Sequence, residues 1–218
     1  MEATTDDHIV DLYDETYFQN GINAGVSCYE SYRWLPEATI GMCQSLIDQL
    51  PIELGQVTLD YGCSRGYVVK SLGILHREAF GCDVSRYAIE NCDPDVRGRV
   101  KVCDGLTIPW PGHFDWLICK DTLEHVPPSF LPRLLTHMAR RTDGIFIVVP
   151  LAHNGEYLVR KENWDVTHRI REGMRFWIEA VSEAFTVEQA THLFPGLKES
   201  YRHVIGGHAF ILGRSRDA

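Results

Sequence analysis

One segment restricts the possible folds of this chain more than any other. It is a short apolar run that ends beside a carboxylate and leads into a loop with two glycines. The run covers residues 57–61, and Gly62 and Gly66 follow it with the small Ser64 between them. Apolar side chains with helical spacing come next, at Val68, Val69, Leu72 and Leu75. A buried strand, a tight loop and a helix in this order favour a sheet covered by helices. The small residues let a ligand approach the backbone closely.

Strand-like and helix-like stretches continue to alternate along most of the chain. We predict strands at residues 57–61, 78–83, 99–103, 114–119, 144–149, 186–190 and 208–212. Helices are expected at residues 36–50, 68–75, 86–92 with Ser85 as the N-cap, 130–138 and 170–184. This alternation predicts an α/β fold, a Rossmann-like, doubly wound and mostly parallel seven-stranded sheet with helices on both faces. In such sheets ligands bind beyond the carboxyl ends of the strands, where the strand order reverses.

The length of 218 residues suits one domain better than two. We expect residues 1–35 to form an N-terminal lid or cap and residues 36–218 to form a single domain. The lid would carry an aromatic wall of Tyr13, Tyr17, Phe18, Tyr29, Tyr32 and Trp34. A strap packed on the edge of the sheet is the alternative for this segment.

The net charge and the cysteines limit the kinds of binding partner and of cellular compartment that we expect. The net charge of −9 argues against a nucleic-acid partner and favours a neutral or cationic small molecule. The seven cysteines include no C-x-x-C pair, which argues against a disulfide framework or zinc site and fits a reducing compartment. We find neither a secretory signal nor an apolar run of bilayer length. These features predict a cytoplasmic protein, either a monomer or a homodimer, with no membrane partner.

Three carboxylates follow three successive predicted strands. Asp60 ends the first strand, Asp83 follows the second at 17 residues beyond Gly66, and Asp104 follows the third. Each has an ordinary interpretation as a cap or turn residue. Together they fit a nucleoside, because a carboxylate after the second strand can bind both ribose hydroxyls. The loop reads G-x-x-x-G and lacks the middle glycine of the dinucleotide fingerprint, which favours a ligand without a pyrophosphate.

The loop resembles motif I of the class I S-adenosylmethionine-dependent methyltransferases. It reads Leu59-Asp-Tyr-Gly-Cys-Ser-Arg-Gly66, with Ser64 where the motif usually has glycine. Gly81-Cys-Asp-Val-Ser85, Cys103-Asp-Gly105 and the stretch 114–126 match later segments of that family in the same order. The last of these contains Leu-Glu-His and is similar to small-molecule methyltransferases of types 11 and 12. The resemblance covers residues 36–150, and more loosely residues up to 214.

The resemblance implies S-adenosylmethionine as cofactor and suggests a role for each matching position. Asp60 would lie near the methionine ammonium, Asp83 beside Val84 would hold the ribose hydroxyls, and Asp104 would face the adenine amine. Further cofactor-binding positions are the loop residues Gly62, Cys63, Ser64 and Gly66, the adenine neighbours Gly105 and Leu106, and Lys120 and Asp121 near the sulfonium.

Methyl transfer to a hydroxyl requires in-line alignment and removal of a proton. His168 is the first candidate for the general base, in a segment that resembles an Asp-x-Thr-His stretch of some small-molecule methyltransferases. His153, His125 and Asp165 are the other catalytic candidates. Alternatively, Asp165 caps the following helix, or Glu162, Asp165 and His168 bind a metal. The preferred prediction includes no metal.

These observations predict methylation of a small molecule or a sugar-containing metabolite, on oxygen rather than nitrogen. The stretch 119–122 lacks the Asn-Pro-Pro-Tyr type of motif that amino-group methyltransferases carry, and the chain has no Pro-Cys nucleophile. Protein and nucleic-acid substrates therefore rank lower. The alternatives are a non-catalytic methyltransferase-like binding module, supported by Ser64, and a nicotinamide-dependent dehydrogenase.

Overall fold

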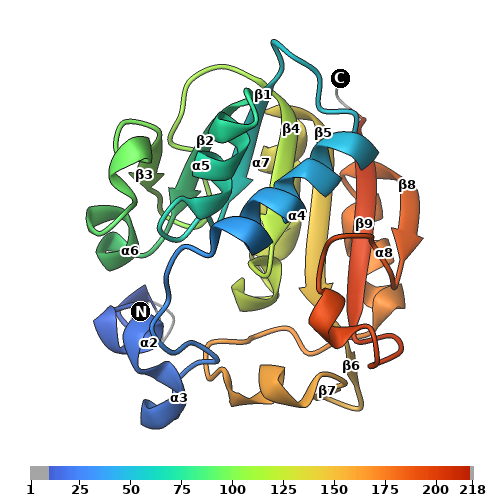
Figure 1. The fold of residues 1–218 in the computed structure, drawn as a ribbon. Helices are drawn as coiled ribbons and strands as arrows, with labels where there is room; N and C mark the ends of the chain where they lie inside the picture. Colours follow the sequence, from blue (N-terminus) through green and yellow to red (C-terminus); the bar gives the residue numbers. More distant parts are fainter. Residues whose placement is uncertain (1–9, 217–218) are drawn as a thin grey trace, which may run out of the picture.

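The computed structural model describes residues 10–216, so residues 1–9 of the predicted N-terminal lid and residues 217–218 lie outside the described part (Figure 1). Seven strands form one sheet in the order β3-β2-β1-β4-β5-β9-β8. Their bounds are Val57–Tyr61 for β1, Glu78–Asp83 for β2, Val100–Val102 for β3, Phe114–Lys120 for β4, Thr142–Pro150 for β5, Phe185–Thr191 for β8 and His208–Ser215 for β9. The strands β1 to β5 are parallel, and β9 runs antiparallel to β5 and β8. The predicted Rossmann-like, mostly parallel sheet is confirmed.

Helices cover both faces of this sheet. The α-helices are α2 at Glu15–Gln19, α3 at Gly21–Ala24, α4 at Pro36–Gln49, α5 at Tyr67–Ile74, α6 at Arg86–Glu90, α7 at Leu131–Ala139 and α8 at Met174–Ser182. Short 3-10 turns are η1 at Pro94–Val96, η2 at Leu123–His125, η3 at Arg160–Trp164 and η4 at Glu199–Tyr201, and a small hairpin joins β6 at Ala152–His153 to β7 at Glu156–Tyr157. None of the helices within residues 10–216 combines the length and the apolar character needed to cross a membrane.

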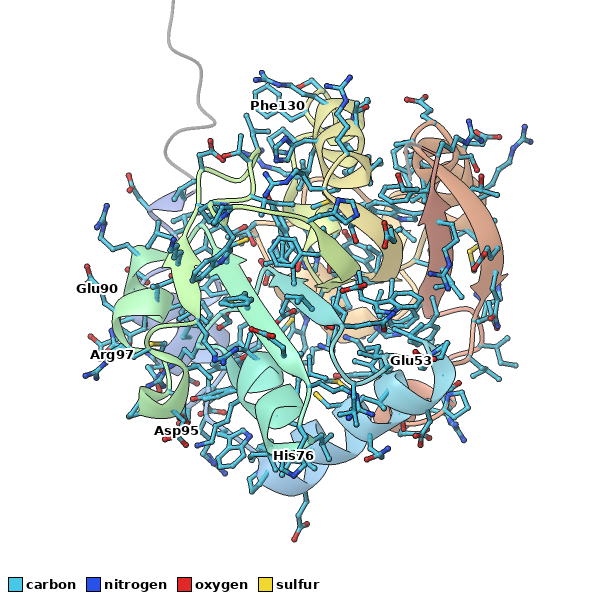
Figure 2. All side chains as sticks on the ribbon, turned by 90° about the horizontal axis from the view of Figure 1, so that it is seen from above. Glu53, His76, Glu90, Asp95, Arg97 and Phe130 are labelled. Carbon is cyan, nitrogen blue, oxygen red and sulfur yellow. The ribbon has the colours of Figure 1, made fainter. Side chains whose placement is uncertain are left out.

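The alternation of side chains along β4 divides the core into two layers. Leu117 and Cys119 pack with the buried faces of α7 and α8, whereas Trp116 and Ile118 pack with those of α4 and α5. Figure 2 shows the same division from above, with Phe130 before α7 on one side of the sheet and His76 after α5 on the other. A strand buried on both faces is apolar along its whole length, which explains the continuous apolar runs in the sequence.

The helix predicted at residues 170–184 begins later, at Met174. The backbone N–H groups of Arg169 and Ile170 both donate to the carbonyl of Glu124, at 2.8 and 3.0 Å. These contacts fix the chain against η2 and keep residues 169–170 out of the helix. They also bring residues 165–170 beside the carboxyl end of β4.

The carboxyl ends of the parallel strands point toward a layer built from two distant segments. Figure 1 shows α2 and α3 beside the stretch that carries β6, β7 and η3, both below the arrowheads of the central strands. The two segments meet directly, because the N–H of Val166 donates to the carbonyl of Val26 at 3.2 Å. This layer covers the point between β1 and β4 where the strand order reverses.

Candidate functional site

A cavity of about 370 Å³ lies at the carboxyl ends of β1, β2 and β4. This volume falls within the usual range for small-molecule sites, and the location is the one expected for an open α/β sheet. The loop after β1 and the residues Asp83, Asp104 and Asp121 line one part of it. His125, Val126, Pro127 and Phe130 line another part, and the N-terminal segment contributes Tyr13, Tyr17, Phe18 and Tyr29 to the wall.

The loop after β1 has the left-handed backbone that its small residues predict. The φ angles of Gly62, Ser64 and Gly66 are 84°, 49° and 77°. A Cβ on Gly66 would lie 2.7 Å from the Val96 side chain, and one on Gly62 would overlap Thr122. Both glycines are therefore required by the close packing of the loop. Ser64 takes up a conformation that usually favours glycine, so the substitution in the motif preserves the loop at some strain.

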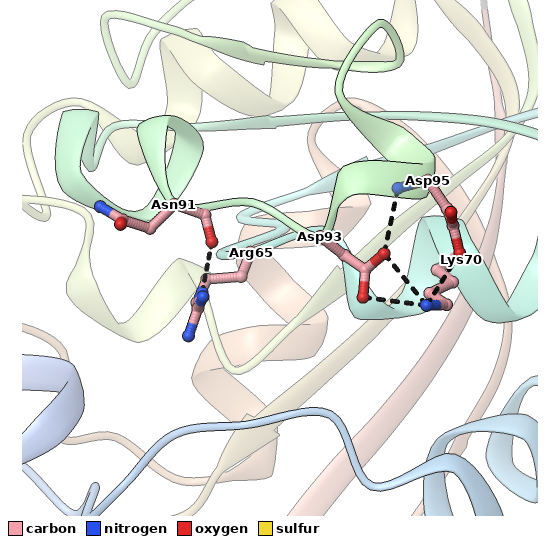
Figure 3. Close-up of polar contacts among 5 residues, drawn as sticks. All are labelled: Arg65, Lys70, Asn91, Asp93 and Asp95. Atoms are coloured by element: carbon pink, nitrogen blue, oxygen red, sulfur yellow. Dashed lines mark hydrogen bonds and ion pairs between the residues drawn. The ribbon is translucent and has the colours of Figure 1, made fainter.

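The outer side of the same loop is held by polar contacts with the chain after α6 (Figure 3). The Arg65 guanidinium donates to the carbonyl of Asn91, and Lys70 on α5 forms ion pairs with Asp93 and Asp95 at 3.0 and 2.9 Å. These contacts fix the loop and the start of α5 from outside the cavity.

Asp83 joins the loop to the end of β2. Its two carboxyl oxygens accept hydrogen bonds from the backbone N–H groups of Ser64 at 2.7 Å and Ser85 at 2.8 Å. Burial raises the pKa of Asp83, and the backbone donors oppose this effect. Ser85 also caps α6 as predicted, with its hydroxyl accepting from Ala88 at 2.9 Å. The carboxylate of Asp83, with Val84, lines the cavity.

Asp104 both forms a turn and lines the cavity. Its Oδ1 accepts from the backbone N–H groups of Leu106 at 2.9 Å and Thr107 at 2.7 Å. Although burial opposes it, these hydrogen bonds lower the pKa of Asp104. The N–H of Leu106 is therefore already used within the protein, whereas Gly105 and Leu106 still form part of the cavity wall.

Asp121 lies at the end of β4 with a φ of 54°. Its Oδ2 lies 2.7 Å from the ammonium groups of both Lys120 and Lys198. Although burial opposes it, the two lysines hold the pKa of Asp121 far below its usual range. No hydrogen-bond partner for the buried Oδ1 is found among residues 10–216. Lys198 comes from the connection between β8 and β9, and nothing in its local sequence indicated this contact.

Four of the predicted cofactor residues lie behind the cavity wall rather than in it: Asp60, Cys63, Gly66 and Lys120. Asp60 is 3% exposed, and burial raises its pKa to about 7, with the charge of Lys120 opposing the shift. Cys63 is also buried, beneath the loop. These residues shape the wall from behind.

The three candidate histidines lie in different surroundings. His125 lines the cavity, and His168 is buried next to it, with the two ring centroids 4.6 Å apart. His153 is exposed on the β6–β7 hairpin, away from the cavity. Of these candidates, only His125 contributes to the cavity wall within the described part of the chain.

A hydrogen-bond chain fixes the orientation of His125. The Thr167 hydroxyl lies 2.5 Å from Oδ1 of Asp165 and 2.8 Å from Nδ1 of His125. Because a carboxylate only accepts, the single hydroxyl proton goes to Asp165, and Nδ1–H of His125 donates to the hydroxyl oxygen. The neutral ring then has its lone pair on Nε2. Burial, followed by the nearby His168, lowers the pKa of His125 to about 4.

The N-terminal segment contacts this chain through Tyr17, whose hydroxyl donates to Oδ2 of Asp165 at 2.7 Å. Tyr13, Tyr17, Phe18 and Tyr29 of the predicted aromatic wall line the cavity. Tyr32 instead stacks on Tyr67, and Trp34 lies under the ammonium of Lys70. The described part of the segment thus covers the cavity, and its action as a lid stays a prediction.

The sheet order and the covering helices are those of the Rossmann-like methyltransferase fold, with a cavity at the carboxyl ends of the strands. Residues 58–143 match the family model described as a methyltransferase domain. This match covers less than half of the chain and includes the loop after β1, Asp83, Asp104 and β4.

Curated relatives and a solved structure are also similar to this chain. The chain is 31% identical over 101 residues to a ubiquinone biosynthesis O-methyltransferase of Albidiferax ferrireducens, covering 42% of this chain and 40% of the relative. It is 27% identical over 113 residues to a magnesium-protoporphyrin O-methyltransferase of Rhodobacter capsulatus, covering 48% and 50%. The chain thus spans half or less of the length of these relatives. The structure of a TehB-like SAM-dependent methyltransferase from Corynebacterium glutamicum superposes with a TM-score of 0.60 at 14% identity, over 81% of this chain and 88% of the other, which shows a shared fold.

Proposed function

We propose that this chain transfers a methyl group from S-adenosylmethionine to an oxygen of a small molecule. The family match and the two O-methyltransferase relatives support this proposal. The observation that carries it is a single cavity with the Asp83 carboxylate and the motif loop in one part and His125 in another. A nucleoside and an acceptor would therefore bind in contact with each other, as methyl transfer requires.

The charges of the cavity favour this cofactor over a dinucleotide. Asp83, Asp104 and Asp121 all line it. A pyrophosphate would be repelled there, whereas a ribose and the cations of the methionine portion would be attracted. In our proposal Asp83 binds the ribose hydroxyls and Asp104 lies on the adenine side. The unpartnered Oδ1 of Asp121, rather than the deeper Asp60, accepts a hydrogen bond from the methionine ammonium.

The acceptor would bind between His125 and the apolar side chains of Val126, Pro127 and Phe130. This wall favours a molecule with an apolar body over an unsubstituted sugar. In our proposal His125 acts on the acceptor hydroxyl through Nε2, in place of the buried His168 that the sequence placed first. Asp165 and Thr167 hold the ring in the required orientation.

The test is formation of S-adenosylhomocysteine with a panel of hydroxyl-bearing small molecules, with and without apolar bodies. We expect turnover with at least one apolar member and its loss in His125→Gln, while cofactor affinity stays within about twofold of wild type. The matched control is His113→Gln, an exposed histidine whose ring nitrogen contacts Asp143. Cofactor binding without turnover on any acceptor would favour the non-catalytic binding module.

A further inference from the structure

Glu124 carries a buried carboxylate that accepts no hydrogen bond from any residue in the described range 10–216. It lies in η2 directly after β4 and is 1% exposed. Neither carboxyl oxygen has a hydrogen-bond partner among the described residues. A buried polar group without a partner destabilises the folded protein, and more so when it is charged. We therefore expect a ligand to bind this carboxylate in place of the missing protein partner.

Two histidines complete a donor set beside this carboxylate. A carboxyl oxygen of Glu124 and one ring nitrogen each from His125 and His168 all lie within 4.8 Å of one another. His168 is 8% exposed, and its Nδ1 has no partner within residues 10–216. Two imidazoles and one carboxylate are a common ligand set for zinc and for other first-row divalent metals.

The surrounding hydrogen bonds hold these three groups together. The carbonyl of Glu124 accepts from the backbone of residues 169 and 170, which fixes His168 next to η2. Thr167 binds Nδ1 of His125, which leaves Nε2 of the same ring as the nitrogen available to a cation. In metal sites the second nitrogen of a histidine ligand is usually held by such a partner, which orients the ring.

We propose that Glu124, His125 and His168 bind one first-row divalent cation, such as Zn²⁺ or Mn²⁺, at the edge of the cavity. The nitrogen ligands disfavour Mg²⁺ and Ca²⁺, which prefer oxygen. The proposal departs from the sequence prediction of no metal, and its ligand set differs from the alternative of Glu162, Asp165 and His168. In the structure Asp165 is instead engaged with Tyr17 and Thr167.

The cation would face the acceptor, because His125 lines the cavity. A hydroxyl bound to a divalent cation ionises at a lower pH. The proton then passes to water, and the oxygen bonds to the methyl carbon as the carbon–sulfur bond breaks, giving S-adenosylhomocysteine and the methylated acceptor. His125 would activate the hydroxyl through the cation and not by taking the proton directly. This role rests on the proposed function, whereas cation binding does not.

The test is titration of the untagged, chelator-treated full chain with Co²⁺, followed by its visible absorption. We expect one equivalent to bind with the absorption bands of a protein-bound cobalt ion. Glu124→Gln and His168→Gln should each weaken binding at least about tenfold, whereas His113→Gln should bind as wild type does. Thermal unfolding and S-adenosylmethionine binding establish that each variant is folded.

Absent cobalt bands in the wild type, or equal binding by Glu124→Gln, would overturn the cation site. If the chelated protein still methylates an acceptor in that case, the proposed function stands with His125 as the direct base. Stoichiometric cobalt binding that depends on Glu124 and His168 would support the site even if no acceptor is methylated.

Discussion

The carboxylate of Asp83 accepts a hydrogen bond from the backbone N–H of Ser64 at 2.7 Å, and this contact joins the loop after β1 to the end of β2. Asp83 also lines the cavity. The Asp83 carboxylate thus shapes the loop and is also the group that we propose to bind the ribose. Loop geometry and cofactor affinity should respond together when it is changed.

Asp83→Ala should weaken S-adenosylmethionine binding by roughly 1–3 kcal/mol, because the ligand hydroxyls and the N–H of Ser64 lose their acceptor. Isothermal calorimetry measures this loss. The control is Asp48→Ala, which removes an exposed carboxylate on α4 that does not line the cavity. Unchanged affinity in Asp83→Ala would remove the ribose assignment.

Ser64→Gly should leave cofactor affinity within about twofold and should not lower stability. The φ of 49° is unfavourable for serine by roughly 1 kcal/mol or more, and glycine relieves this strain at an entropic penalty of similar size. Chemical denaturation and calorimetry test both statements. A large loss of affinity would show that the serine side chain, and not only its backbone, contributes to binding.

The ionisation of Asp60 should lower the free energy of unfolding as the pH rises from about 4 to 7. Burial raises its pKa from 3.8 to about 7, so the folded chain keeps a proton that the unfolded chain has released. The contribution is fully present below pH 3.8 and is lost as the pH rises through about 7, with a slope of at most about 1.4 kcal/mol per pH unit.

Urea denaturation at several pH values in this range gives the free energy of unfolding of wild type and of Asp60→Asn. The difference between their pH slopes is the contribution of Asp60. Asp48→Asn, which changes an exposed carboxylate on α4, should keep the wild-type slope. Parallel curves for Asp60→Asn and wild type would contradict the raised pKa.

Tyr17→Phe should loosen the N-terminal segment, since it removes the 2.7 Å hydrogen bond to Asp165 and leaves Oδ2 without this donor. We expect a loss of about 1–2 kcal/mol in unfolding free energy and faster proteolysis before residue 36. Tyr87→Phe is the control, because that ring stacks on Phe18 in the same cluster. Equal proteolysis of the two variants would argue for a strap held by packing alone.

The sequence was sufficient for the strands at the centre of the sheet. β1 and β2 have the predicted bounds, because buried runs end at Asp60–Gly62 and at Asp83. Eight of the twelve residues predicted to bind the cofactor line the cavity, since they follow strand ends and the ends of parallel strands lie together.

The rest of the site depends on contacts between distant segments. Lys198 reaches Asp121 from the β8–β9 connection, and His168 reaches Glu124 through a backbone contact that also shortens α8. Such contacts leave no periodic signal in the sequence. That His125 lines the cavity and His168 does not has the same cause, because only the fold decides which ring reaches the cavity wall.

Thermal unfolding with S-adenosylmethionine and, separately, with NAD tests the central claim most directly. A ligand at a hundred times its dissociation constant adds about 2.7 kcal/mol, which raises the Tm of a chain of this size by roughly 5–10 °C. We predict this rise with S-adenosylmethionine, its reduction in Asp83→Ala, and no rise with NAD. A rise with NAD and none with S-adenosylmethionine would contradict the assignment of this cavity.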